Sequence, residues 1–257
     1  MSSRAADGAR LALGTLTVLP VRPPGRVNRS VGGIAMTLAP LAALPLAGVC
    51  GLTVWLAGQA LPPLLTAAIA LAVLALGSGG LHWDGLADTA DGLAVPGDRE
   101  RRLAVMRTGD VGPVGAATLV LVLLAQAAAV ADVVARLGAS EAAVTAGLAV
   151  VVSRTVVTMA CTNGIPGARA DGLGSAVAGS VPWPVTVAVL AGVAGLSWLV
   201  DGVPGLAGVA LAAIAAGAVL WCAWRRLGGV TGDVLGACVE LALVGFLVAE
   251  VALLPAV

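Results

Sequence analysis

The chain has no lysine and no tyrosine, and only one histidine and one phenylalanine among its 257 residues. All 14 basic residues are therefore arginine. Charged residues make up 11% of the chain, whereas a soluble globular domain carries roughly a quarter. This scarcity of charge excludes an ordinary water-soluble domain and a disordered chain. Any functional site must be built from arginine, acidic side chains, the backbone and few aromatic groups.

The four cysteines show no pattern of a metal site or a disulfide framework. Cys50, Cys161, Cys222 and Cys238 lie within or beside apolar runs, and no two of them have metal-ligand spacing. A structural zinc site would have to combine these scattered positions with His82 alone. We therefore expect the cysteines to be small apolar packing residues.

Apolar residues dominate the rest of the sequence, at 59% of the chain with a mean hydropathy of +1.02. A bilayer core needs about 20 apolar residues per helix. The sequence predicts an all-α, polytopic helical bundle that forms a single integral membrane domain over residues 1–257, with about seven transmembrane helices. The expected spans are 33–57, 61–80, 113–134, 141–161, 181–200, 204–224 and 234–254. Pro40 and Pro45 should kink the first of them.

The arginines lie almost entirely on one side of these spans. Thirteen of the 14 fall in the N-terminal segment, in the charged loops or at the same end of a helix, and Arg136 falls on the other side. Basic residues accumulate in the short cytoplasmic loops of membrane proteins. We therefore expect a cytoplasmic N-terminus and cytoplasmic charged loops. Residues 9–19 are too short for a signal peptide and lack a cleavage pattern, so we expect them at the membrane interface.

The loop expected at 81–112 holds ten charged residues and begins with three aspartates. Asp84, Asp88 and Asp91 are spaced i, i+4 and i+7, which places them on one side of a helix. Like charges at this spacing repel one another, and a bound cation relieves the repulsion. Oxygen ligands favour Mg²⁺, which is often shared with substrate phosphates. The pattern therefore favours a magnesium site for diphosphate chemistry over a solvated helix whose aspartates pair with nearby arginines.

Arginines in the charged loops are candidates for phosphate binding, because the guanidinium group binds phosphate oxygens bidentately. Segment 98–107 interleaves charged and apolar residues, as in a short helix on the membrane face, and it ends at Arg107. Arg169 lies in a second charged loop, which is rich in glycine. The positive-inside bias alone explains most of the other arginines.

The glycine-rich segment 228–240 precedes and begins the last span. Thr231 and Asp233 stand where a helix N-terminus presents free N–H groups to an anion. An ordinary N-cap is the simpler explanation of this segment taken alone.

Two charged residues fall in apolar sequence, Arg154 and Glu240. An ionised side chain near the bilayer centre costs at least about 2.5–3.5 kcal/mol, so we expect both to face the bundle interior. There they either pair with each other or serve the site. His82, beside Trp83, is either a packed interfacial residue or part of the site.

Together these segments resemble the cobalamin synthase family, the membrane-embedded adenosylcobinamide-GDP ribazoletransferases of bacteria. The resemblance extends from Thr17 to the last span. It rests on Gly-Gly-Leu-His-Trp-Asp-Gly-Leu-Ala-Asp-Thr-Ala-Asp-Gly at 79–92, Asp98-Arg99, Met106-Arg107, Ser153-Arg154, Ala168-Arg169 with Gly172-Leu173-Gly174, and 228–240.

The resemblance implies a transferase that joins adenosylcobinamide-GDP and α-ribazole, or its 5′-phosphate. The expected products are adenosylcobalamin, or its 5′-phosphate, and GMP. Mg²⁺ is the implied cofactor, the lipid bilayer of the bacterial inner membrane is the implied environment, and the active-site loops are expected on the cytoplasmic side. No nucleic-acid partner is expected, and a homo-oligomer is compatible with the pattern.

The resemblance also implies roles for individual residues. Asp84, Asp88 and Asp91 are expected to be catalytic metal ligands, and Asp233 is expected to complete the metal site or accept the hydroxyl proton. The expected substrate-binding residues are His82, Arg107, Arg154, Arg169, Thr231 and Glu240. The chain departs from the family at Thr108, where an Asp is frequent, and at Gln126, where a Lys is frequent.

Other classes of membrane protein fit the sequence less well. A CDP-alcohol phosphotransferase motif requires Arg after Asp-Gly-x-x-Ala, but Asp88 follows Ala87. A polyprenyl transferase would carry a second Asp-rich cluster. A cation-coupled transporter or channel would place charge near mid-membrane in several spans, whereas here the charge is concentrated on one face.

Overall fold

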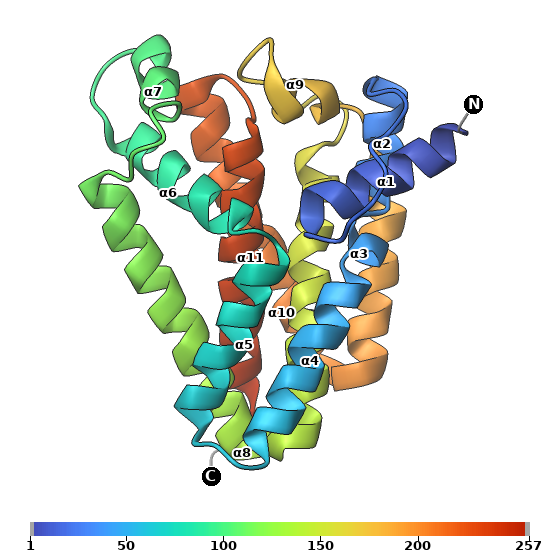
Figure 1. The fold of residues 1–257 in the computed structure, drawn as a ribbon, viewed down its shortest axis with the longest axis vertical. Coiled ribbons are helices and arrows are strands. Elements are labelled where there is room, and N and C mark those ends of the chain that lie inside the picture. The colour runs from blue at the N-terminus through green and yellow to red at the C-terminus, as the bar shows by residue number, and fades with distance from the viewer. Residues whose placement is uncertain (1–2, 255–257) are drawn as a thin grey trace.

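The computed structural model describes residues 3–254, and within that range it is helical with no strand. Figure 1 shows the helices packed as an elongated bundle. The helices are α1 (Arg4–Leu16), α2 (Arg29–Thr37), α3 (Ala39–Ala42), α4 (Leu44–Gly58), α5 (Pro63–Gly77), α6 (Leu81–Ala94), α7 (Arg99–Val105), α8 (Pro113–Ala160), α9 (Gly172–Val177), α10 (Trp183–Leu227) and α11 (Gly232–Leu253).

The two longest helices, α8 with 48 residues and α10 with 45, each consist of two arms. The backbone leaves helical geometry at Gly138 (φ 78°) in α8 and at Gly202 (φ 61°) in α10, and glycine adopts such positive φ angles without a steric penalty. A helix of about 20 residues spans the bilayer core. The four arms therefore correspond to four of the expected spans, and Figure 1 shows α8 descending in green and returning in yellow.

The last helix, α11, lies at the centre of the bundle. Within its most apolar window 78% of the residues are buried, against 28% for α8 and 33% for α10. It packs against α10, α8 and α6. Helices α8, α10 and α11 are each long and apolar enough to cross a membrane. This confirms the expected all-α membrane bundle.

The first expected span, 33–57, is broken into α2, α3 and α4. Pro40 lies in the first turn of α3 and Pro45 in the first turn of α4. Proline is tolerated in a first turn but interrupts a continuing helix. The kinks expected at these two prolines are therefore confirmed.

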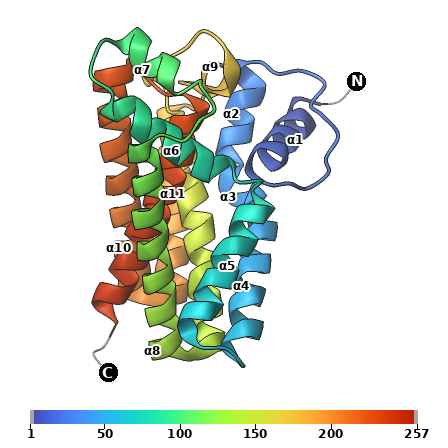
Figure 2. The same ribbon diagram turned by 60° about the vertical axis from the view of Figure 1, so that its left-hand side comes forward.

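The chain turns by 91° between α5 and α6. The turn is made by Gly79 (φ 65°) and Gly80 (φ 72°). Both have left-handed backbone angles, which glycine adopts without a steric penalty. As a result α6 lies across the end of the bundle rather than along it, beside α7 and α9 (Figures 1 and 2). The three aspartates of α6 and the other charged loops are thus gathered at one end of the molecule.

Candidate active site

A cavity of about 320 Å³ opens at this end, between α6, the loop before α9 and the start of α11. We call it the acidic cleft. Apolar side chains of α1, α2 and α8 close its inner part, among them Leu16, Met36 and Val157. Its polar lining includes Asp84, Arg169, Asp171, Thr231 and Asp233.

Helices α6 and α11 approach each other closely at Gly85. A Cβ atom at this position would lie 2.7 Å from the carbonyl oxygen and 2.9 Å from the Cα of Asp233, so no larger residue fits without moving the helices. The contact brings Asp84 and Asp88, which flank Gly85 on α6, to the first turn of α11. Asp84 and Asp233 therefore both line the cleft, and Asp88, which is not part of the lining, lies within electrostatic range of both at its rim.

Asp88 shows the electrostatic result of this approach. Burial of the half-buried carboxyl and, to a smaller extent, the negative charges of Asp84, Asp233 and Asp91 together raise its pKa to about 6, while Arg169 acts in the opposite direction. The rim thus carries more negative charge than its own arginine neutralises. A cation or a positively charged group would be stabilised there.

Asp233 is held by two donors. Its Oδ2 accepts hydrogen bonds from the Thr231 hydroxyl at 3.1 Å and from the Arg169 guanidinium at 3.4 Å. The Thr231 Oγ1 also accepts from the N–H of Val234 at 3.2 Å, which makes Thr231 the N-cap of α11. Arg169 reaches further, to the carbonyl of Leu103 at 3.1 Å. Two expected site residues, Thr231 and Arg169, therefore both contact a third, Asp233, on the cleft wall.

Asp91 lies elsewhere. It is buried, and its two carboxylate oxygens accept hydrogen bonds from the N–H groups of Gly112 at 2.7 Å and Gly115 at 2.8 Å. These groups belong to the start of α8, so Asp91 caps that helix from outside. Within residues 3–254 no three His, Cys, Asp or Glu side chains are grouped so that they could hold a metal ion. The structure therefore gathers neither Asp84, Asp88 and Asp91 nor Asp84, Asp88 and Asp233 into one three-carboxylate site.

A magnesium site of a different composition fits the residues at the rim. Mg²⁺ is commonly held by one or two protein carboxylates, with waters and substrate phosphates as the other ligands. Asp84 and Asp88, with Asp233 nearby, offer oxygen donors only. The pKa of Asp88 is raised first by burial and second by neighbouring carboxylates, and a bound cation would favour the charged form against both. Asp91 fits less well, because both of its oxygens already accept backbone N–H groups.

Arg154 and Glu240 lie inside the bundle, at 0% and 2% exposure. An Nη of Arg154 lies 3.3 Å from Nδ1 of His82, and that Nδ1 lies 4.0 Å from Oε1 of Glu240. Gln126 donates to Oε2 of Glu240 at 2.8 Å. We call these four residues the buried network. It joins α6, α8 and α11 beneath the cleft, and His82 belongs to both the network and the cleft lining.

Arg107 lies at the outer lip of the cleft. It donates to Oδ1 of Asp171 at 2.7 Å, and both side chains are more than half exposed. Asp171 was not among the predicted site residues, although it stands two positions after Arg169 in the same glycine-rich loop. Gln126 was noted as a departure from the family but was missed as a partner of Glu240, although it is a polar amide within an apolar run.

Comparison with known proteins gives a consistent result. The family model described as cobalamin-5-phosphate synthase matches residues 8–251. A relative from Nocardioides sp. is 48% identical over 248 residues, covering 95% of this chain and 97% of its own length. Relatives from Frankia casuarinae (36% identical, 91% and 90% covered) and Pseudomonas aeruginosa (38%, 93% and 95%) are similar as well. All three carry the name adenosylcobinamide-GDP ribazoletransferase. No solved structure matches the chain.

Proposed function

The chain belongs to the cobalamin-5-phosphate synthase family, and from this membership we propose that it is an adenosylcobinamide-GDP ribazoletransferase whose active site is the acidic cleft. It joins adenosylcobinamide-GDP to α-ribazole or its 5′-phosphate and releases GMP. The observation that supports the choice of site is the close approach of α6 and α11 at Gly85, which places Asp84 and Asp233 in one cavity with Arg169 and puts Asp88 within electrostatic range of both aspartates.

The transfer forms one bond and breaks one. A hydroxyl oxygen of ribazole bonds to the cobinamide-side phosphorus of the diphosphate, and the bond from that phosphorus to the bridging oxygen breaks. The bridging oxygen leaves with GMP. The hydroxyl proton passes to a carboxylate of the cleft, and we assign this role to Asp233, which Thr231 and Arg169 hold in a fixed orientation.

The remaining groups of the cleft bind charge. Asp84 and Asp88 would hold Mg²⁺, which would supply positive charge to offset the charge of the diphosphate and of the leaving GMP. Arg169 is placed to donate to phosphate oxygens, because its contact with Asp233 is long, at 3.4 Å, and its Nε is buried without a partner among the described residues. The buried network supports the cleft from below by fixing α6 against α8 and α11.

We also propose that the cleft faces the cytoplasm from the bacterial inner membrane. Thirteen of the 14 arginines are on the side expected to be cytoplasmic, and the helices and loops that carry most of them gather at the cleft end of the bundle (Figure 1). GDP-bearing substrates and GMP are polar and would be exchanged with that compartment.

The proposal is tested with the full-length protein purified in detergent. We expect adenosylcobinamide-GDP, α-ribazole and Mg²⁺ to give adenosylcobalamin and GMP in equal amounts, and we expect Asp84→Asn to lose most of this turnover. Glu141→Gln, an exposed carboxylate after the Gly138 turn, is the matched control and should keep it. Absence of GMP under conditions in which a relative is active would overturn the function, and full turnover by Asp84→Asn would overturn the site.

A further inference from the structure

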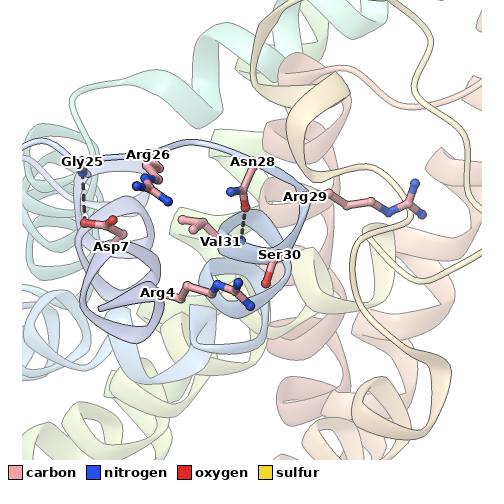
Figure 3. A pocket seen from close by; sticks show the side chains of 8 residues that line it. All are labelled: Arg4, Asp7, Gly25, Arg26, Asn28, Arg29, Ser30 and Val31. Atoms are coloured by element: carbon pink, nitrogen blue, oxygen red, sulfur yellow. Dashed lines mark hydrogen bonds between the residues drawn. The ribbon is translucent and has the colours of Figure 1, made fainter. Parts of the chain in front are cut away.

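A second cavity, of about 470 Å³, lies between α1, α2 and the loop that connects them. Figure 3 shows it with Arg4 on α1, Arg26 on the loop, and Asn28 and Ser30 at the start of α2. None of its lining residues lines the acidic cleft. It is therefore a separate feature of the same end of the molecule.

Hydrogen bonds hold the frame of this cavity. Oδ1 of Asp7 accepts from the N–H of Gly25 at 3.0 Å, which ties the loop to α1. Oδ1 of Asn28 accepts from the N–H of Val31 at 3.0 Å and caps α2. Arg29 points away from the cavity in Figure 3 and donates to the carbonyl of Gly179. These bonds therefore fix the loop against α1 and fix the start of α2.

The two remaining arginines are unpaired. Arg4 and Arg26 both line the cavity, and neither guanidinium group forms an ion pair or a hydrogen bond with any of residues 3–254. Asp7 is the carboxylate in the lining, and it is also engaged by Arg10 at 3.4 Å. The cavity therefore has an excess of positive charge, carried by guanidinium groups whose donors are free.

We propose that this cavity binds a phosphate group, which is either free phosphate or the headgroup phosphate of an anionic phospholipid. Two guanidinium groups offer the forked donor geometry that suits phosphate oxygens. The volume exceeds what one phosphate needs, so an attached organic group also fits. The positive-inside bias accounts for the number of arginines on this face, but it does not require two of them to border one cavity without acidic partners. The inference is independent of the proposed function.

The test measures the thermal unfolding midpoint of the full-length protein as a function of ligand concentration, since a ligand that binds the folded state raises that midpoint. One arm adds inorganic phosphate in zwitterionic detergent, with chloride at matched ionic strength as the blank. The other arm compares phosphatidylcholine nanodiscs with and without phosphatidylglycerol. The variant is the double change Arg4→Gln and Arg26→Gln. The matched control is Arg22→Gln, an exposed arginine of the same loop outside the cavity lining.

We expect at least one probe to stabilise the wild-type protein and Arg22→Gln, and the double variant to bind that probe at least about tenfold more weakly. Stabilisation by both inorganic phosphate and phosphatidylglycerol identifies the phosphate group itself as the ligand. Stabilisation by only one of them identifies free phosphate or the lipid headgroup as its source. The proposal is overturned if neither probe stabilises the wild type, if the double variant responds as strongly as the wild type, or if Arg22→Gln loses as much as the double variant does.

Discussion

The acidic cleft and the buried network lie next to each other but differ in charge balance: the rim of the cleft has an excess of negative charge, whereas the network combines opposite charges. At the rim of the cleft, Asp84 and Asp88 carry charge of one sign, and burial together with neighbouring carboxylates raises the pKa of Asp88 to about 6. Beneath it, Arg154 and Glu240 have opposite charges, and each is hydrogen-bonded or in contact with polar neighbours. Burial requires charges to be paired. Near water an excess of negative charge is tolerated, and the unneutralised carboxylates remain available to bind a ligand.

The largest loss of stability is expected when one of the two opposite charges of the buried network is removed. Arg154→Leu leaves Glu240 buried without its counter-charge, and removal of one partner of a buried pair typically costs about 3–5 kcal/mol. We expect a strongly lowered unfolding midpoint in detergent and a reduced yield of folded protein. The double change Arg154→Leu and Glu240→Leu removes both charges and should recover part of the loss. If the single variant were as stable as the wild type, the pairing of the network would be refuted.

At the rim of the cleft, by contrast, removal of a charge is expected to preserve stability and to lower turnover. Asp88→Asn removes a charge that is disfavoured first by burial and second by neighbouring carboxylates, as the raised pKa shows. The folded protein should therefore be as stable as the wild type or more stable. Turnover should fall by about 10²–10³-fold, as when a preorganised electrostatic group is lost from an active site. Unfolding midpoints and GMP release measure the two effects. A large loss of stability with little loss of turnover would contradict the claim that Asp88 serves activity rather than stability.

Asp91 lies on the same helix as the rim aspartates but should behave as a structural residue. In Asp91→Asn one carboxylate oxygen becomes an NH₂ group, which then faces a backbone N–H of Gly112 or Gly115. We expect a loss of about 1 kcal/mol, as for other removed helix caps. Turnover per folded molecule should fall far less than in Asp88→Asn. Equal loss of turnover in the two variants would assign Asp91 to the metal site after all.

The smallest effect is expected at the lip of the cleft. Arg107 and Asp171 form an exposed ion pair, with side chains 53% and 68% accessible. Exposed pairs contribute at most about 1 kcal/mol, so Arg107→Gln should change stability by no more than that. We expect kcat/KM for adenosylcobinamide-GDP to fall less than about fivefold. A larger fall, measured by steady-state kinetics, would show that Arg107 binds substrate directly.

Much of the fold could be predicted because it depends on local sequence. Apolar runs of bilayer length predicted the spans, and Pro40 and Pro45 predicted the breaks between α2, α3 and α4. The alternation of charged and apolar residues predicted the short helix α7. The 91° turn at Gly79 and Gly80 was not predicted, because a glycine pair permits a turn without setting its angle.

The site was only partly predictable, for a geometric reason. Residues i and i+7 share a helix face but lie about 10.5 Å apart along its axis. Asp84 therefore reaches the cleft, whereas Asp91 reaches the start of a different helix. The cost of burying charge predicted that Arg154 and Glu240 face the interior. Their partners His82 and Gln126 come from other parts of the chain, which only the packing of α6, α8 and α11 brings together.

The central claim is that Asp84 and Asp88, and not Asp91, hold the metal ion at the cleft. Electron paramagnetic resonance of Mn²⁺, used in place of Mg²⁺ and titrated into the purified protein with adenosylcobinamide-GDP present, tests it most directly. The account predicts that the wild type and Asp91→Asn bind Mn²⁺ with similar affinity and that Asp88→Asn binds it at least about tenfold more weakly. Unchanged binding by Asp88→Asn, or its loss in Asp91→Asn, would contradict the account.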